Sequence, residues 1–162
     1  MDTFDFAMGM ELDGKKYYEK LANETPHAGL STIFTRLAKD EQKHYDVIQS
    51  LKADATATMA NTTVLEESKN LFQELMTDNF IVGSMQKDLD GYRHAVKIEA
   101  DSVRFYEDAA SKESSKETAD LLLRIAGEEK KHFNIMDNLY DFALKPEYYL
   151  EWREFSNLNK EL

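Results

Sequence analysis

Six residues, four glutamates and two histidines, form a spaced pattern that occurs twice in the chain. In each copy a glutamate is followed thirty residues later by a Glu-x-x-His motif, and the second copy is displaced by 88 residues (99 − 11, 129 − 41 and 132 − 44). The first copy consists of Glu11, Glu41 and His44, and the second of Glu99, Glu129 and His132. Carboxylates and imidazoles suit divalent first-row metals, so the pattern predicts a site for two metal ions.

The spacing within Glu-x-x-His has a simple meaning if the motif lies on a helix. Residues three apart share one face, so a carboxylate and an imidazole there can reach the same ion. Two such pairs on facing helices, with one bridging carboxylate from each of the other two helices, complete a two-metal set. The bridging carboxylates in this arrangement would be Glu11 and Glu99.

The repeat extends beyond the candidate ligands. A third Glu-x-x-His, from Glu24 to His27, straddles Pro26 and cannot share a regular helical face. The other two motifs lie among residues that match at the same displacement, namely Ala7/Ala95, Asp13/Asp101, Tyr18/Tyr106, Glu19/Glu107, Arg36/Arg124 and Lys43/Lys131. Duplication of a helical hairpin explains this register better than chance.

The alternative interpretation is that these residues are solvated charges on ordinary amphipathic helices. Against it, Glu41 and His44 stand between Leu37 and Ile48 on a seam that is otherwise apolar. Burying four carboxylates without cations would cost on the order of several kcal/mol each, and two divalent ions would offset that charge. We therefore favour the metal site.

The apolar pattern predicts an all-α, ferritin-like four-helix bundle in one domain spanning 1–162. Segment 54–91 is too long for a hairpin and is expected to cross over the bundle, with an amphipathic piece from Val64. The tail at 146–162 carries aromatic residues and is expected to form a short C-terminal helix, either as a lid on the core or as a dimer contact. The four core helices are predicted at about 4–23, 30–53, 92–111 and 116–144.

Several residues near the candidate ligands invite a further role. Tyr18 and Tyr106 follow the upstream glutamates by seven residues, and we favour core packing with a hydroxyl bond to a ligating carboxylate over supply of an electron or proton. Gly14 and Ser102 occupy matched positions three residues after the upstream glutamates. A small residue at each position leaves room for close helix packing or for a small ligand. Two histidines without a partner in the repeat are expected on the surface or in loops: His27 and His94.

Composition excludes several classes of function. The 162 residues include no cysteine, which excludes disulfides, thiolate zinc sites and cysteine-ligated iron–sulfur clusters and fits a cytoplasmic location. The formal charge of −11 argues against nucleic acid or an anionic membrane as a partner. The N-terminal segment lacks the features of a signal peptide, and no apolar run is long enough to predict a membrane span.

The stretches around the candidate ligands carry a family resemblance. With GMELDGKKYYEKLA, LAKDEQKHYDVI, KIEADSVRFYEDAA and IAGEEKKHFNIM, the chain resembles the rubrerythrin-like branch of the ferritin-like di-iron carboxylate proteins over roughly residues 4–144. The resemblance implies a bundle with a long crossover, two iron ions at the six residues, and chemistry on peroxide, dioxygen or ferrous iron. Manganese or zinc would accept the same ligands.

Three family features are missing from this chain. Rubrerythrins proper carry a cysteine-ligated rubredoxin module that supplies electrons, so an external electron donor is expected here. They commonly carry a seventh carboxylate three residues after the third-helix glutamate, where this chain has Ser102. The haem-binding methionine of bacterioferritins directly follows the second-helix glutamate, where this chain has Gln42, so no haem is expected.

Three functions are compatible with these features. The leading hypothesis is an oxidoreductase that reduces hydrogen peroxide or dioxygen at a non-haem di-iron centre. The second is ferrous oxidation for iron storage or detoxification, with iron as substrate. The third is a non-enzymatic bundle that senses metal or docks a partner. We expect a homodimer, paired through the crossover or the tail.

Overall fold

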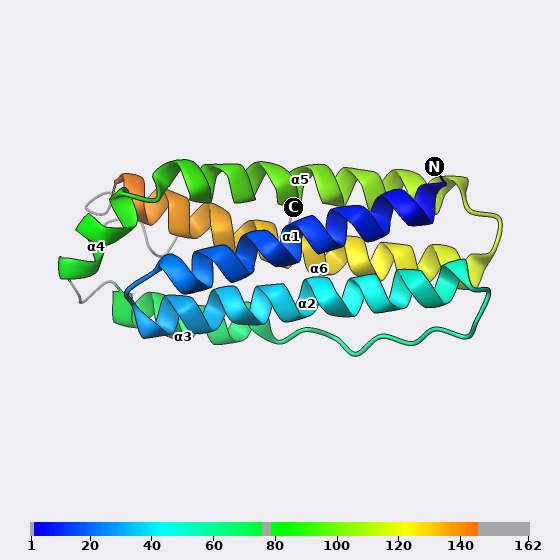
Figure 1. The fold of residues 1–162 in the computed structure, drawn as a ribbon, viewed down its shortest axis with the longest axis horizontal. Coiled ribbons are helices and arrows are strands. Elements are labelled where there is room, and N and C mark those ends of the chain that lie inside the picture. The colour runs from blue at the N-terminus through cyan, green and yellow to red at the C-terminus, as the bar shows by residue number, and fades with distance from the viewer. Residues whose placement is uncertain (1, 76–78, 146–162) are drawn as a thin grey trace.

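Four long helices form the bundle, in two antiparallel hairpins (Figure 1). The computed structural model describes residues 2–75 and 79–145, apart from the side chains of residues 79 and 80. Regular structure in these ranges is entirely helical, which confirms the predicted all-α ferritin-like bundle. The first hairpin pairs α1 with α2 and the second pairs α5 with α6: Thr3–Glu24, Ala28–Lys52, Leu89–Lys112 and Lys116–Leu144.

Local sequence signals set the ends of these helices. The Asp2 side chain accepts a hydrogen bond from the Asp5 N–H at the start of α1, and Ser115 caps α6 in the same way through Thr118. Helix α1 ends at Glu24 because Thr25 precedes Pro26 and adopts an extended conformation. All four long helices begin and end within three residues of the predicted bounds.

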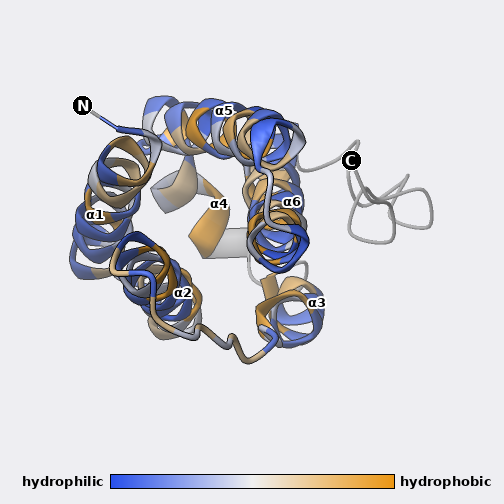
Figure 2. Ribbon diagram, turned by 90° about the vertical axis from the view of Figure 1, so that its right-hand side faces the viewer, coloured by the Kyte–Doolittle hydropathy of each residue, from blue (hydrophilic) through white to orange (hydrophobic). Residues whose placement is uncertain are grey.

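The crossover closes one side of the bundle. After α2 the chain runs back along the bundle without regular structure and then forms α3, Val64–Leu75, at the predicted amphipathic piece. Helix α3 lies outside the four-helix square and packs against α2 and α6 (Figure 2). The short α4, Asn79–Gln86, packs against α6 at one end of the bundle (Figure 1). The predicted C-terminal helix and aromatic tail at 146–162 lie outside the described residues.

The buried apolar residues fall into two clusters along the bundle. One cluster lies toward α3 and α4 and includes Phe34, Leu37 and Phe142, and the other includes Ile48 and Ile125 near the opposite end. On both α2 and α6 the Glu-x-x-His motif lies between the residues of one cluster and those of the other. The polar residues therefore interrupt a core that is otherwise apolar. Of the helices described, none is long and apolar enough to span a membrane.

Candidate metal centre

The six predicted ligands meet inside the bundle, and each is at most 4% exposed. They form two overlapping groups of four side chains, in which one potential ligand atom from every member lies within 4.8 Å of the others. The first group is Glu11, Glu41, His44 and Glu129, and the second is Glu41, Glu99, Glu129 and His132. This arrangement could hold two metal ions side by side.

Two glutamates belong to both groups, and they are not the ones that spacing had suggested. Glu41 and Glu129 are shared, whereas Glu11 and Glu99 each belong to one group only. This grouping favours Glu41 and Glu129, in place of Glu11 and Glu99, as the carboxylates that could bridge two ions. The physical reason is that spacing along a helix determines which residues share a face, but not which helix brings its carboxylate between the two groups.

Unpartnered buried atoms show that the centre fits cations. Four buried atoms make no hydrogen bond to any described residue, namely Glu11 Oε2, His44 Nδ1, Glu99 Oε2 and Glu129 Oε1. His44 Nδ1 lies 2.7 Å from Glu129 Oε1 and 3.5 Å from Glu11 Oε2, close but without hydrogen-bond geometry. Buried polar atoms without hydrogen bonds are costly, and two metal ions, one in each group, would satisfy all four atoms.

Each histidine is held from outside by a carboxylate of the other hairpin. The His44 Nε2–H donates to Glu128 Oε1 at 2.8 Å, and the His132 Nε2–H donates to Asp40 Oδ2 at 2.9 Å. These bonds leave Nδ1 of both rings toward the centre and fix the ring orientation. Asp40 and Glu128 were not predicted from the sequence, although both directly precede a Glu-x-x-His glutamate and are displaced by the same 88 residues (128 − 40).

The two tyrosines link the hairpins in a similar way. Tyr18 on α1 donates its hydroxyl to Glu99 Oε1 on α5, and Tyr106 on α5 donates to Glu11 Oε1 on α1. Both rings are buried. Each tyrosine therefore holds one oxygen of a carboxylate whose second oxygen, Oε2, makes no hydrogen bond to a described residue. Core packing and a carboxylate bond, both anticipated from the sequence, describe this geometry.

A family comparison supports the same conclusion. A family model described as Rubrerythrin matches residues 2–140. The chain belongs to the rubrerythrin family. No curated protein and no solved structure gave a significant match to this rubrerythrin-family chain.

The remaining singled-out residues have clear places in this rubrerythrin-family protein. A Cβ added at Gly14 would lie 3.3 Å from Glu41 Oε2, so the glycine leaves room for a shared carboxylate. Ser102, at the matched position on α5, is also buried. His27 caps α2 through Leu30, and the exposed His94 packs against Tyr17, so neither joins the candidate centre.

The surroundings of the centre raise the pKa values of four of its six candidate ligands. Burial by itself lowers the pKa of His44, but the negative charge of Glu11 outweighs burial and raises that pKa well above its usual value. The same balance, with Glu99 as the neighbouring charge, raises the pKa of His132. Burial and the charges of neighbouring glutamates also raise the pKa values of Glu41 and Glu129.

Metal binding to this rubrerythrin-family protein is therefore expected to release protons. The four groups with raised pKa values would each give up a proton to a metal, so loading with two divalent ions near neutral pH should release up to four protons. Because protons compete for the same atoms, metal affinity should fall as pH falls. The change in a pH-indicator dye on adding Zn²⁺ to weakly buffered protein measures the release, and no release would contradict the expectation.

The pKa values of the two outer carboxylates, Asp40 and Glu128, are lowered and not raised. Burial raises the pKa of Asp40, but the hydrogen bond and charge of His132 outweigh it and lower the pKa to about 2. Burial likewise raises the pKa of Glu128, and hydrogen bonds from His44 and Lys43 lower it below its usual value. Asp40 and Glu128 therefore remain charged at neutral pH and keep accepting the Nε2–H of both histidines.

Proposed function

We propose that this rubrerythrin-family protein is an oxidoreductase that reduces hydrogen peroxide or dioxygen at a di-iron centre, with electrons from an external donor. The observation that supports it most is the set of unpartnered buried atoms on Glu11, His44, Glu99 and Glu129, which belong to two overlapping groups of ligand type. The proposed ligands are the six residues of the repeat: Glu11, Glu41, His44, Glu99, Glu129 and His132.

The side chains around the centre would prepare it for this reaction. A bound metal pair supplies redox chemistry and neutralises charge that develops on the oxygens of the substrate. The chain itself holds the histidine rings through Asp40 and Glu128, and holds Glu11 and Glu99 through tyrosine hydroxyls. The apolar clusters on both sides exclude bulk water, which strengthens the electrostatic interactions inside the site.

Stopped-flow absorbance of the iron-loaded, reduced protein tests this proposal. One hydrogen peroxide per di-iron centre should oxidise both ferrous ions, because peroxide accepts two electrons. An added reductant should restore the starting spectrum. Glu129→Gln, which changes a carboxylate common to both groups, serves as the impaired control. Failure of the wild-type protein to react with either peroxide or dioxygen, despite full iron loading, would rule out the proposed reaction.

The same preparation separates the two other functions. Light scattering should give the mass of a homodimer, whereas a large hollow cage that accumulates iron beyond two ions per chain would point to storage. A fully loaded protein that turns over neither peroxide, dioxygen nor ferrous iron would point to metal sensing.

A further inference from the structure

Thr62, in the crossover just before α3, contacts both outer carboxylates of the centre. Its backbone N–H donates to Glu128 Oε2 at 2.8 Å, and its hydroxyl donates to Asp40 Oδ2 at 2.6 Å. Thr62 is only 8% exposed, whereas its neighbours Asn61 and Thr63 are exposed. A single residue of an irregular segment thus joins α2 to α6 from outside the four-helix square.

These contacts complete a hydrogen-bonded chain between the two histidines. From His44 the chain passes through Glu128, Thr62 and Asp40 to His132. Every link is between 2.6 and 2.9 Å long, which is a normal hydrogen-bond length. The outward faces of both imidazoles are therefore tied to the same point of the crossover.

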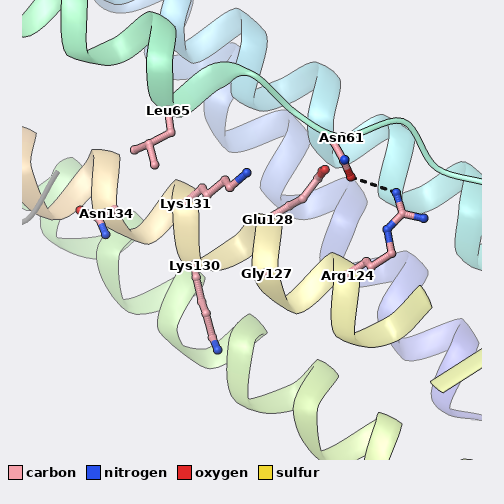
Figure 3. Close-up of a pocket in the computed structure, with 8 residues that line it drawn as sticks. All are labelled: Asn61, Leu65, Arg124, Gly127, Glu128, Lys130, Lys131 and Asn134. Atoms are coloured by element: carbon pink, nitrogen blue, oxygen red, sulfur yellow. Dashed lines mark hydrogen bonds between the residues drawn. The ribbon is translucent and has the colours of Figure 1, made fainter. Parts of the chain in front are cut away.

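The backbone around Thr62 is itself fastened to the bundle. Arg124 on α6 donates to the Met59 carbonyl at 2.5 Å and to Asn61 Oδ1 at 2.9 Å, and Figure 3 shows its guanidinium directed at Asn61. Lys43 on α2 donates to the Ala60 carbonyl at 2.8 Å. Both helices thus hold the segment in place, so Thr62 has a fixed position from which to orient Asp40 and Glu128.

We propose that Thr62 is a positioning residue for both histidines of the metal centre, acting through Asp40 and Glu128. This inference rests on the proposed metal-binding function. Carboxylates that accept the outer N–H of a ligating histidine fix its tautomer and ring orientation, and changing such partners typically weakens metal binding about 10–100-fold. The competing role for Thr62 is local, because its hydroxyl oxygen also accepts the Val64 N–H at 3.2 Å at the start of α3.

Substitution of the Thr62 side chain separates the two roles. Thr62→Val removes the hydroxyl bond to Asp40 but keeps the backbone bond to Glu128. The orientation of the His132 ring should therefore be less well fixed, whereas that of the His44 ring should stay as in wild type. In zinc titrations against a competing chelator, one of the two ions should bind about tenfold more weakly. In nitrogen-15 NMR of the zinc-loaded protein, the Nε2–H of His132 should exchange with water faster, while that of His44 stays as in wild type.

Two further variants serve as controls. Thr62→Ser keeps the hydroxyl and should restore wild-type affinity and exchange. Thr63→Val removes a hydroxyl that bonds Glu67 on α3 without reaching Asp40, and should leave zinc binding unchanged. If Thr62→Val does not fold, Thr62→Ala removes the same hydroxyl with less bulk and takes its place.

The outcomes distinguish failure of this inference from failure of the proposed function. If wild-type protein binds two zinc ions, and Thr62→Val binds zinc as well as Thr63→Val does, the role of Thr62 is overturned while the proposed centre stands. The role of Thr62 would also be overturned if Thr62→Val weakened the binding of both zinc ions equally and the Nε2–H groups of His44 and His132 exchanged with water at the same rate. A wild-type protein that does not bind two metal ions would overturn the proposed centre and this inference together.

Discussion

Glu41→Gln is expected to weaken both metal positions, whereas Glu11→Gln is expected to weaken only one. Glu41 belongs to both groups of candidate ligands and Glu11 to the first group alone. Because a direct ligand is lost, the weakening should exceed the about 10–100-fold typical of an outer hydrogen-bond partner. Metal content after dialysis should fall toward zero for Glu41→Gln and toward one ion per chain for Glu11→Gln. Equal losses in the two variants would contradict the sharing of Glu41.

The same pair of variants should behave in the opposite order without metal. The pKa of Glu41 is raised well above its usual value by burial and then by the charge of Glu11. This shift favours the protonated acid, for which glutamine is a close substitute. Burial also raises the pKa of Glu11, but hydrogen bonds and the charge of His44 outweigh it and lower the pKa, so glutamine there removes a charged partner.

Thermal unfolding measures this inversion. Without metal, Glu41→Gln should unfold at or above the wild-type temperature. Metal-free Glu11→Gln should unfold at a lower temperature, because its free energy of unfolding should fall by about 1–3 kcal/mol. Added zinc should raise the unfolding temperature of wild type, because a ligand that binds only the folded state stabilises it, and should raise that of Glu41→Gln far less. A Glu41→Gln protein that is strongly destabilised without metal would refute the protonated state assigned to Glu41.

The double variant Tyr18→Phe, Tyr106→Phe is expected to lose about 2–6 kcal/mol of metal-free stability, or about 1–3 kcal/mol per tyrosine. Each hydroxyl donates to a buried glutamate of the other hairpin, Glu99 or Glu11, and phenylalanine leaves that oxygen without its donor. Because Glu11 and Glu99 belong to overlapping groups that share Glu41 and Glu129, comparison of the single and double losses also measures the coupling between them. Chemical denaturation of the two single variants and the double variant measures this.

Peroxide oxidation distinguishes this supporting role from direct electron supply. Burial and then the charges of neighbouring glutamates raise the pKa values of Tyr18 and Tyr106 well above the usual value, so both hydroxyls stay protonated as donors. If the tyrosines only hold the carboxylates, iron-loaded wild-type protein should give no tyrosyl radical signal in electron paramagnetic resonance after peroxide is added. A radical signal that disappears in the double variant would show electron supply instead.

Sequence periodicity accounts for most of the fold and for the identity of the clustered residues. The long helices could be bounded to within three residues because capping residues and Pro26 act locally. The six candidate ligands could be named because duplication writes the same pattern twice in the chain. Helix α4 was not anticipated, since eight residues within a long crossover give too short a pattern to stand out.

The sequence by itself determined that two hairpins each bring a glutamate and a Glu-x-x-His to one interior position, because residues on one helix face follow from spacing alone. Only the tertiary structure decided that Glu41 and Glu129 are shared, that Asp40 and Glu128 hold the histidines of the opposite hairpin, and that Thr62 joins them. These are contacts between separate elements. Their partners depend on how helices and an irregular segment pack together, which periodicity along a single helix does not encode.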